Sequence, residues 1–171
     1  MSRTEYRTPD GRLWVIEEGL IYGADAEVAT WISNRLGGGS VQTLFVGIGA
    51  LKEGTNPEDV TAENLPSVLV AGAYFFNHYD EELSDLSWVV AVDDFTIARP
   101  NVLRQVMRYP FRQLKVRRLT SEILLINERA VSQAKLMGFK LEGRKRRMGP
   151  GGTDVGIFGL VPEDFPFGIP A

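Results

Sequence analysis

The chain has 171 residues, a length typical of one domain, and its 44% hydrophobic and 24% charged residues are the usual mixture of a globular protein. It contains no cysteine, which excludes disulfides, thiolate nucleophiles, iron–sulfur clusters and cysteine zinc sites. The first ten residues are polar, so no signal peptide is expected, and no apolar run approaches the roughly 20 residues of a membrane-spanning helix. These features favour a cytoplasmic protein without a membrane anchor.

The net charge of −3 is unevenly distributed along the chain. Residues 99–147 hold 14 basic and 3 acidic residues, a net of +11, and the rest holds 5 basic and 19 acidic residues, a net of −14. One interpretation is a polyanionic partner for the basic part, and the other is mutual pairing or solvation of both parts. The basic run Arg144–Arg147 either contacts nucleic-acid phosphates or forms a solvated strand edge, and the second is favoured, so nucleic acid is not an expected partner.

In the first half of the chain, short apolar runs at Leu13–Ile16 and Leu20–Tyr22 predict an opening strand or hairpin. Helical spacing of apolar residues predicts a helix over Asp25–Leu36, and β-forming residues predict a strand pair at Thr43–Leu51 and Val68–Phe76.

An acidic connection joins these two strands and is expected to contain a short helix. Asn56 is the predicted N-cap of that helix, and Pro57 is the proline of its first turn. Leu86–Val92 is almost entirely apolar and predicts a strand buried on both faces. Three tryptophans are expected in the core: Trp14, Trp31 and Trp88.

The second half follows a more regular pattern. An apolar stripe predicts a helix over Asn101–Leu114 that Pro110 should kink or end early. A strand over Val116–Leu125 and a helix over Glu128–Met137 follow, the latter ended by Gly138.

Two further strands, Leu141–Met148 and Asp154–Val161, flank a glycine-rich turn, and the tail Pro162–Ala171 is expected to be irregular. The segment 86–125 is therefore a β–α–β crossover among antiparallel hairpins. This order predicts an α/β fold with a mixed sheet and helices on its faces.

The segment Tyr109–Phe139 presents an ordered series: a helix that ends in an aromatic residue, an arginine-containing strand, an asparagine that opens a helix, and a Gly-Phe that ends it. A Glu-Gly-plus-basic strand, a turn and a closing strand complete it by Leu160. From Trp88 to Leu160 the chain resembles the GCN5-related N-acetyltransferase (GNAT) superfamily, closest to its phage-encoded and N-terminal-acetyltransferase-like members. The resemblance implies a single GNAT-like domain over 1–171, a central mixed sheet with helices on both faces.

The resemblance also implies acetyl-CoA as cosubstrate and no metal. A primary amine, such as a protein N-terminus, a lysine or a small amine, would attack the thioester directly. The family pattern places the pantetheine-binding backbone at Val90, Ala91 and Val92, and the pyrophosphate-binding place in the loop Thr96–Leu103. Further cofactor-binding residues implied in this way are Arg99, Asn101, Val102, Arg104 and Asn127.

Two departures from the family pattern stand out. Most members have glycines in the phosphate loop, whereas this chain has none over Ile97–Val102, and Pro100 removes one N–H donor. Arg99 and Arg104 could compensate through charge-assisted bonds. The general-acid tyrosine of many members is replaced by Ala134, and the serine of other branches by Ala130.

Three residues are candidates for catalysis: Asp93 or His78 as a general base, and Ser87 as a residue that positions a water molecule. Each also has a structural interpretation. His78 is the only histidine, and a lone histidine is more often structural, while Asp93 begins an Asp-Asp pair typical of a turn.

The leading hypothesis is thus an acetyl-CoA-dependent N-acetyltransferase. The alternative is a catalytically silent GNAT-like domain that serves as a virion-associated or host-interaction protein of a phage, located in the host cytoplasm or on the virion. The expected partners are an amine acceptor of unknown identity and a macromolecular assembly or a second copy of the chain.

Overall fold

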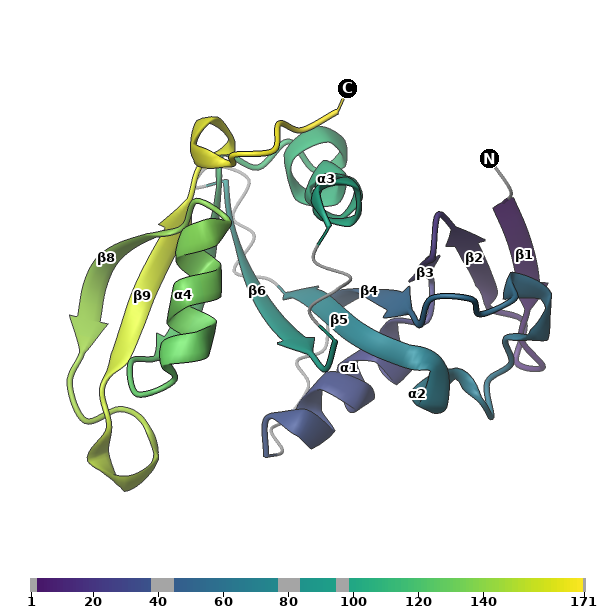
Figure 1. Cartoon of the computed structure of the whole chain (residues 1–171), viewed down its shortest axis with the longest axis horizontal. Coiled ribbons are helices and arrows are strands. Elements are labelled where there is room, and N and C mark those ends of the chain that lie inside the picture. The colour runs from purple at the N-terminus through teal and green to yellow at the C-terminus, as the bar shows by residue number, and fades with distance from the viewer. Residues whose placement is uncertain (1–2, 38–44, 77–83, 95–98, 171) are drawn as a thin grey trace. The chain divides into compact units, whose positions relative to one another are not determined.

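The computed structural model describes residues 3–37, 45–76, 84–94 and 99–170 (Figure 1). The chain forms two compact units, one of residues 1–76 with 89–102 and the other of residues 77–88 with 103–171. The division falls within strand β6 (Asp85–Val92), whose first half belongs to the second unit. The expected single domain over 1–171 stays a prediction.

The first unit is built on an antiparallel sheet that runs in the order β1-β2-β3-β4-β5, followed by the second half of β6. The predicted opening hairpin and central strand pair are confirmed. Their bounds are β2 Leu13–Glu17, β3 Leu20–Tyr22, β4 Phe45–Leu51 and β5 Leu69–Phe76. Strand β1 (Arg3–Arg7) was not predicted, because four of its five residues are polar and only its pairing with β2 defines it.

Helix α1 (Asp25–Arg35) packs against β4 and β5, where glycines replace side chains. A Cβ at Gly49 would lie 2.6 Å from the Leu69 side chain, and one at Gly72 would lie 3.1 Å from Val28. The backbone N–H of Gly47 also donates to Asp25 Oδ1 at 2.7 Å. The helix therefore lies directly on the sheet. Its apolar face, which includes Trp31, packs in the same core as Trp14.

The connection between β4 and β5 contains a 3₁₀ turn (η1, Pro57–Asp59) and a short helix α2 (Leu65–Val68). The predicted N-cap is confirmed, because Asn56 Oδ1 accepts a hydrogen bond from the Glu58 N–H at 3.3 Å. Leu65 is fully buried and anchors this connection to the core of the first unit.

The second unit has the strand order β6-β7-β9-β8. Strand β7 (Arg118–Leu124) runs parallel to the start of β6, which confirms the predicted crossover. Strands β8 (Lys140–Lys145) and β9 (Val155–Leu160) are antiparallel, as predicted, so the sheet is mixed.

The crossover contains helix α3 (Pro100–Arg108), whose first three residues lie in the first unit. Pro110 does not simply end the helix, because the chain continues as a π-helical turn over Tyr109–Gln113. Proline has no N–H for the α-helical bond, and the turn instead closes with the Leu114 N–H on the Tyr109 carbonyl at 3.0 Å.

Helix α4 (Glu128–Leu136) is followed by Gly138 in the left-handed conformation, with φ of +91°. Phe139 then enters the core of the second unit and stacks on Trp88, with ring centroids 5.4 Å apart. All three tryptophans are at most 5% exposed, as predicted. The tail is more ordered than expected, since it contains a 3₁₀ turn (η5, Pro162–Asp164) and the buried Phe165.

In the described part of the chain, every helix is too short or too polar to cross a bilayer.

Replacing Gly138 by alanine should destabilise the protein strongly. The added Cβ would overlap the backbone oxygen of Asp164, and the positive φ adds strain of about 1 kcal/mol. We expect a total loss of about 3 kcal/mol in the free energy of unfolding, measured by urea titration. Gly151→Ala is the matched control, since Gly151 has φ of +66° but open space around its Cβ position. Equal losses in both variants would contradict the packing argument.

Candidate functional site

Strand β6 is the element on which the expected pantetheine-binding residues lie. In the first unit, Ala91 is buried at 7% exposure, whereas Val90 is 39% exposed. The predicted burial of Leu86–Val92 on both faces is therefore wrong at Val90, although Trp88, which points to the same face of the strand, is only 5% exposed. The exposed valine leaves apolar surface beside the backbone of Ala91 and Val92.

The end of β6 is fixed by a backbone and a side-chain contact of Asp93. The Asp93 N–H donates to the Val70 carbonyl at 2.8 Å. Its carboxylate accepts from Arg35 Nε at 2.8 and 2.9 Å and from Arg35 Nη2 at 2.6 Å. This fork-like pair joins the last turn of α1 to the residue that follows Val92.

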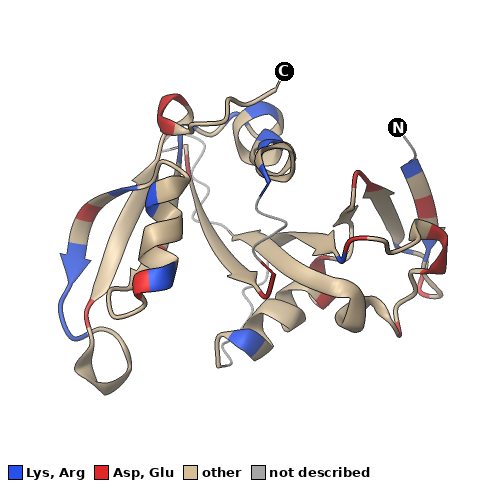
Figure 2. Ribbon diagram, in the orientation of Figure 1, with Lys and Arg blue, Asp and Glu red and all other residues tan. Residues whose placement is uncertain are grey.

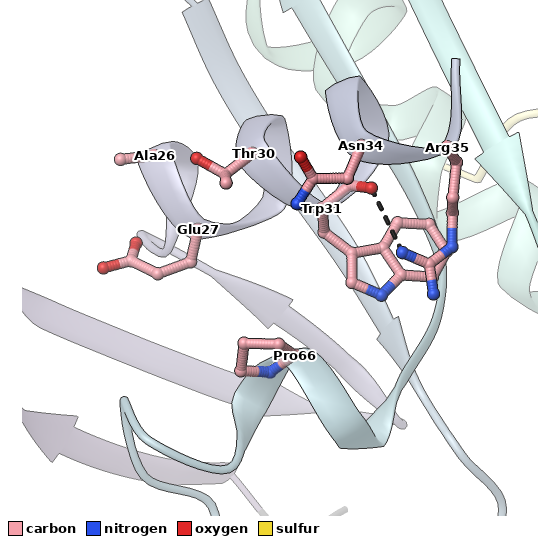
Figure 3. Close-up of a pocket in the computed structure, with 7 residues that line it drawn as sticks. All are labelled: Ala26, Glu27, Thr30, Trp31, Asn34, Arg35 and Pro66. Carbon is pink, nitrogen blue, oxygen red and sulfur yellow. Dashed lines mark hydrogen bonds between the residues drawn. The ribbon is translucent and has the colours of Figure 1, made fainter. Parts of the chain in front are cut away.

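Arg35 is itself held by the residue one helical turn earlier. Its guanidinium carbon lies 3.4 Å from the centroid of the Trp31 ring, and its Nη1 donates to the Trp31 carbonyl at 3.2 Å (Figure 3). Because Trp31 is only 3% exposed, the ring is a rigid support. The guanidinium therefore presents a fixed donor pair to Asp93.

These hydrogen bonds from Arg35 lower the pKa of Asp93. The carboxylate is ionised at neutral pH, but its charge and lone pairs are already satisfied, which makes it a weak proton acceptor. The contacts favour an anchoring role for Asp93. Its assignment as a general base stays a prediction.

A hollow of about 330 Å³ lies along α1 and faces the β4–β5 connection (Figure 3). One wall of the hollow consists of two adjacent rows of α1 side chains, and within each row the residues are four positions apart in the sequence. Glu27, at one end, accepts from Arg12 Nη2 at 2.7 Å and Nη1 at 3.0 Å. The lining residues are Ala26, Glu27, Thr30, Trp31, Asn34, Arg35 and Pro66.

The residues expected to bind phosphate begin α3. Arg99 Nη2 pairs with Glu53 Oε2 at 2.9 Å, and both side chains are exposed. Pro100 is the first residue of the helix, and Asn101 and Val102 complete its first turn. The first part of the predicted phosphate loop, through Ala98, lies outside the described residues.

Three predicted residues lie in the second unit. Ser87 on β6 is opposite Thr120 on β7. Arg104 Nε donates to the Phe167 carbonyl of the tail at 2.6 Å. Asn127 caps α4, with its Oδ1 accepting from the Ala130 N–H at 3.1 Å.

The parallel ladder of β6 and β7 is short. In the second unit it contains three pairs, from Asp85 with Arg118 to Ser87 with Thr120. Within the second unit, Ser121–Leu124 pairs with β9 on one side only. The described part of this unit therefore has a strand edge whose backbone groups are available to an extended ligand.

The structure thus joins some of the predicted residues and leaves others unconnected. In the first unit, Val90–Val92 and Asp93 form one continuous segment, while Arg99 pairs with an acidic residue that was not predicted. In the second unit, Ser87, Arg104 and Asn127 have separate partners. His78 lies outside the described residues.

Sequence reasoning missed Arg35 and its contacts with Trp31 and Asp93. The signal within α1 was the four-residue spacing of Trp31 and Arg35, which places the guanidinium over the ring. The pairing with Asp93 joins residues 58 positions apart in the chain, so local patterns could not reveal it.

No cluster of three or more His, Cys, Asp or Glu side chains suited to a metal ion occurs among residues 3–37, 45–76, 84–94 and 99–170.

Comparison with known proteins identifies the fold. No family model matches the sequence, and no curated protein matches it. Among solved structures, a candidate acetyltransferase matches with a TM-score of 0.60 and 14% identity over 88% of this chain and 87% of that one. The spermidine/spermine N-acetyltransferase SpeG from Vibrio cholerae, in complex with manganese ions, matches with a TM-score of 0.54 and 12% identity over 70% of this chain.

The chain spans 66% of the length of SpeG in that comparison. The predicted fold, a mixed sheet with flanking helices of the GNAT acyltransferase type, is confirmed by these likenesses.

The Arg35–Asp93 pair should make stability depend on pH. The folded-state pKa of Asp93 is lowered below the ordinary value of 3.8, so the pair stabilises the protein above that value and loses its effect as the pH falls through the folded pKa. Since the side chains are 33% and 46% exposed, we expect Arg35→Met to cost about 1 kcal/mol at pH 7, the cation–π contact included, and less near pH 3.

Urea titrations at both pH values measure this difference. Asp93→Asn is the companion variant, and it should lose the same pH-dependent part of the free energy of unfolding. A gap between wild type and Arg35→Met that is equally large at both pH values would show that the pair contributes nothing through its charge.

Proposed function

We propose that the chain is an acetyl-CoA-dependent N-acetyltransferase that acts on a primary amine. The observation that carries this proposal is the GNAT-type fold together with the short parallel ladder of β6 and β7. Within the described residues of the second unit, Ser121–Leu124 of β7 pairs on one side only, and such a strand edge can bind the amides of an extended pantetheine arm.

Acetyl-CoA supplies an activated acetyl group as a thioester. The nitrogen lone pair of the amine attacks the carbonyl carbon, the C–S bond breaks, and the thiolate of CoA leaves while the ammonium loses its proton. This route needs no protein nucleophile, which agrees with a chain that lacks cysteine. Backbone N–H groups of Val90–Val92 are the proposed donors to the carbonyl oxygen as it gains negative charge.

The anchoring of Asp93 supports this use of β6. The residue that follows Val92 is held by the Val70 carbonyl and by Arg35, so the end of the strand is fixed. Oriented donors accelerate a reaction only if they are positioned before charge develops. We propose that Arg35 and Trp31 act through Asp93 as positioning residues.

To bind phosphate, Arg99 and Arg104 would have to give up the hydrogen bonds that they make in this structure. The Arg99–Glu53 pair is exposed, and such pairs contribute roughly 0–1 kcal/mol. Arg104 donates to a neutral carbonyl, which is a weaker acceptor than a phosphate oxygen. A polyphosphate cosubstrate is therefore a plausible competitor for both guanidinium groups.

The acceptor is an amine: a protein N-terminus, a lysine or a small amine. The likeness to a spermidine/spermine N-acetyltransferase supports amine chemistry in general. Ala134 and Ala130 stand where many family members have a general acid, so we propose that solvent protonates the departing thiolate.

The second proposal is a GNAT-like domain without activity, used by a phage in its virion or against host proteins. The observations that favour it are the contacts already made by Arg99 and Arg104 and the absence of glycine between residues 97 and 102. Such a protein would bind a macromolecule and ignore acetyl-CoA.

Calorimetric titration of acetyl-CoA into the purified chain separates the two proposals. We expect binding in the micromolar range, about −8 kcal/mol, and a loss of roughly tenfold in affinity for Arg99→Ala or Arg104→Ala, because each removes a charged donor to phosphate. Arg144→Ala is the matched control, since Arg144 is an exposed arginine paired with Asp154 elsewhere in the second unit. Absence of heat at millimolar acetyl-CoA would refute the transferase and leave the silent domain.

A further inference from the structure

The C-terminal tail ends in a segment, residues 166–170, that lies along the crossover helix α3 and the π-helical turn after it (Figure 1). Arg104 Nε donates to the Phe167 carbonyl of this segment at 2.6 Å. Arg112 donates to two later carbonyls of the segment, at 2.9 and 3.2 Å. Two exposed guanidinium groups of the second unit thus hold the backbone of residues 166–170, which we call the strap.

The residues just before the strap are anchored in a different way. Phe165 is only 4% exposed, and Asp164 accepts a hydrogen bond from Lys140 Nζ at 2.8 Å. Beyond Phe165 the side chains of the strap are half-buried or exposed, and Gly168 has a positive φ of +69°. The strap can therefore leave α3 without removing a buried side chain from the core.

The groups that hold the strap are charged, whereas the groups that they hold are neutral. Residues 95–121 contain seven basic residues and no acidic one. Arg108 lies between Arg104 and Arg112 on the same face of the helix. Within the described residues, Arg108 donates to Gln105 and Arg112 to the strap, and neither forms an ion pair. Because a phosphate oxygen is a stronger acceptor for a guanidinium than a carbonyl oxygen, this row favours an anion over the strap.

Arg104 is the group that the strap and the proposed cosubstrate both need. The proposed function assigns its guanidinium to a phosphate of acetyl-CoA. It lies four positions after Pro100, the first residue of α3, which is about 6 Å along the helix axis from the end that favours phosphate. The Phe167 carbonyl occupies its Nε, so the strap and a phosphate compete for one donor. Arg112, two turns further along, has no part in the proposed phosphate binding and holds the strap alone.

We propose that the strap is an autoinhibitory contact, in which residues 166–170 hold Arg104 away from the phosphates of acetyl-CoA and Arg112 keeps them in place. The inference rests on the proposed acetyltransferase function and adds its regulation. Acetyl-CoA binding then requires release of the strap, and any partner that draws the tail off α3 raises the affinity for acetyl-CoA. The affinity of the full chain is that of the open form reduced by the fraction of molecules that are open.

Two variants should increase the affinity for acetyl-CoA in calorimetric titrations. A chain that ends after Pro166 lacks the strap carbonyls and should bind about fivefold more tightly, the factor for a strap closed in about four of five molecules. Arg112→Ala keeps the whole tail but removes two of its hydrogen bonds, and it should bind about threefold more tightly.

The matched control is Arg146→Ala, which removes another exposed arginine from the second unit, in the connection that follows β8. Loss of a positive charge weakens the attraction for a polyanion, so this variant should bind acetyl-CoA equally or slightly less tightly. An increase in affinity for Arg112→Ala alone is therefore opposite in sign to the effect of charge.

A double variant locates the effect at Arg104. In the Arg104→Ala background, ending the chain after Pro166 should change the affinity less than twofold, because the strap then has no phosphate donor to withhold. A gain of about fivefold that persists in this background would show that the tail acts by another route and would overturn the inference. Circular dichroism checks the fold of each variant, and Arg112→Ala keeps the test valid if the shortened chain does not fold.

Movement of the strap is measured separately. Because the chain has no cysteine, a single cysteine added after its last residue carries a fluorescent dye at one defined position. The anisotropy of the dye should fall in Arg112→Ala, without any cosubstrate, and also when acetyl-CoA saturates the full chain. An anisotropy that stays constant during saturation would contradict release of the strap.

The outcomes separate this inference from the proposed function. Equal affinities of the full chain, the shortened chain and Arg112→Ala for acetyl-CoA would overturn the autoinhibitory strap and leave the transferase standing. Absence of acetyl-CoA binding to all three chains would refute both. Binding by the full chain that becomes tighter in both variants, but not in Arg146→Ala, would support both.

Discussion

The close approach of α1 to its sheet is the constraint on which the first unit depends. Gly49 and Gly72 have no side chains where Val28 of the helix meets the strands, and larger residues would force the helix away. At this separation Trp31 enters the core and Arg35 lies over its ring. In the same packing, Arg35 reaches Asp93, the residue that follows strand β6.

Several basic residues of the second unit are paired within that unit. Lys145 pairs with Glu122 and Arg144 with Asp154, while Arg118 donates to Glu142 at 2.6 Å. Arg112 donates to the tail carbonyls of Ile169 and Pro170. The blue segments of β8 in Figure 2 are thus paired with acidic residues of neighbouring strands and turns, so pairing accounts for part of the positive charge of this region.

Local patterns predicted most of the elements, because a helix or a buried strand repeats its apolar residues within a few positions. These patterns failed where the structure of a segment depends on a neighbouring strand or on the groups packed against it. Strand β1 is polar and exists through its pairing with β2, and the exposure of Val90 depends on what covers each face of β6. The candidate site followed the same division: the β6 segment was predicted from sequence, whereas the Arg35–Asp93 contact depends on tertiary packing.

The missing glycines of the phosphate loop can be interpreted through Pro100. As the first residue of α3 it gives up an N–H that has no partner inside a helix, so the helix itself loses nothing. What is lost is one backbone donor to a bound phosphate, and the neighbouring Arg99 can supply a charged donor in its place. Recognition by such a side chain is more sensitive to salt than recognition by backbone amides. The proposed binding of phosphate would therefore depend on side-chain charge more than on backbone dipoles.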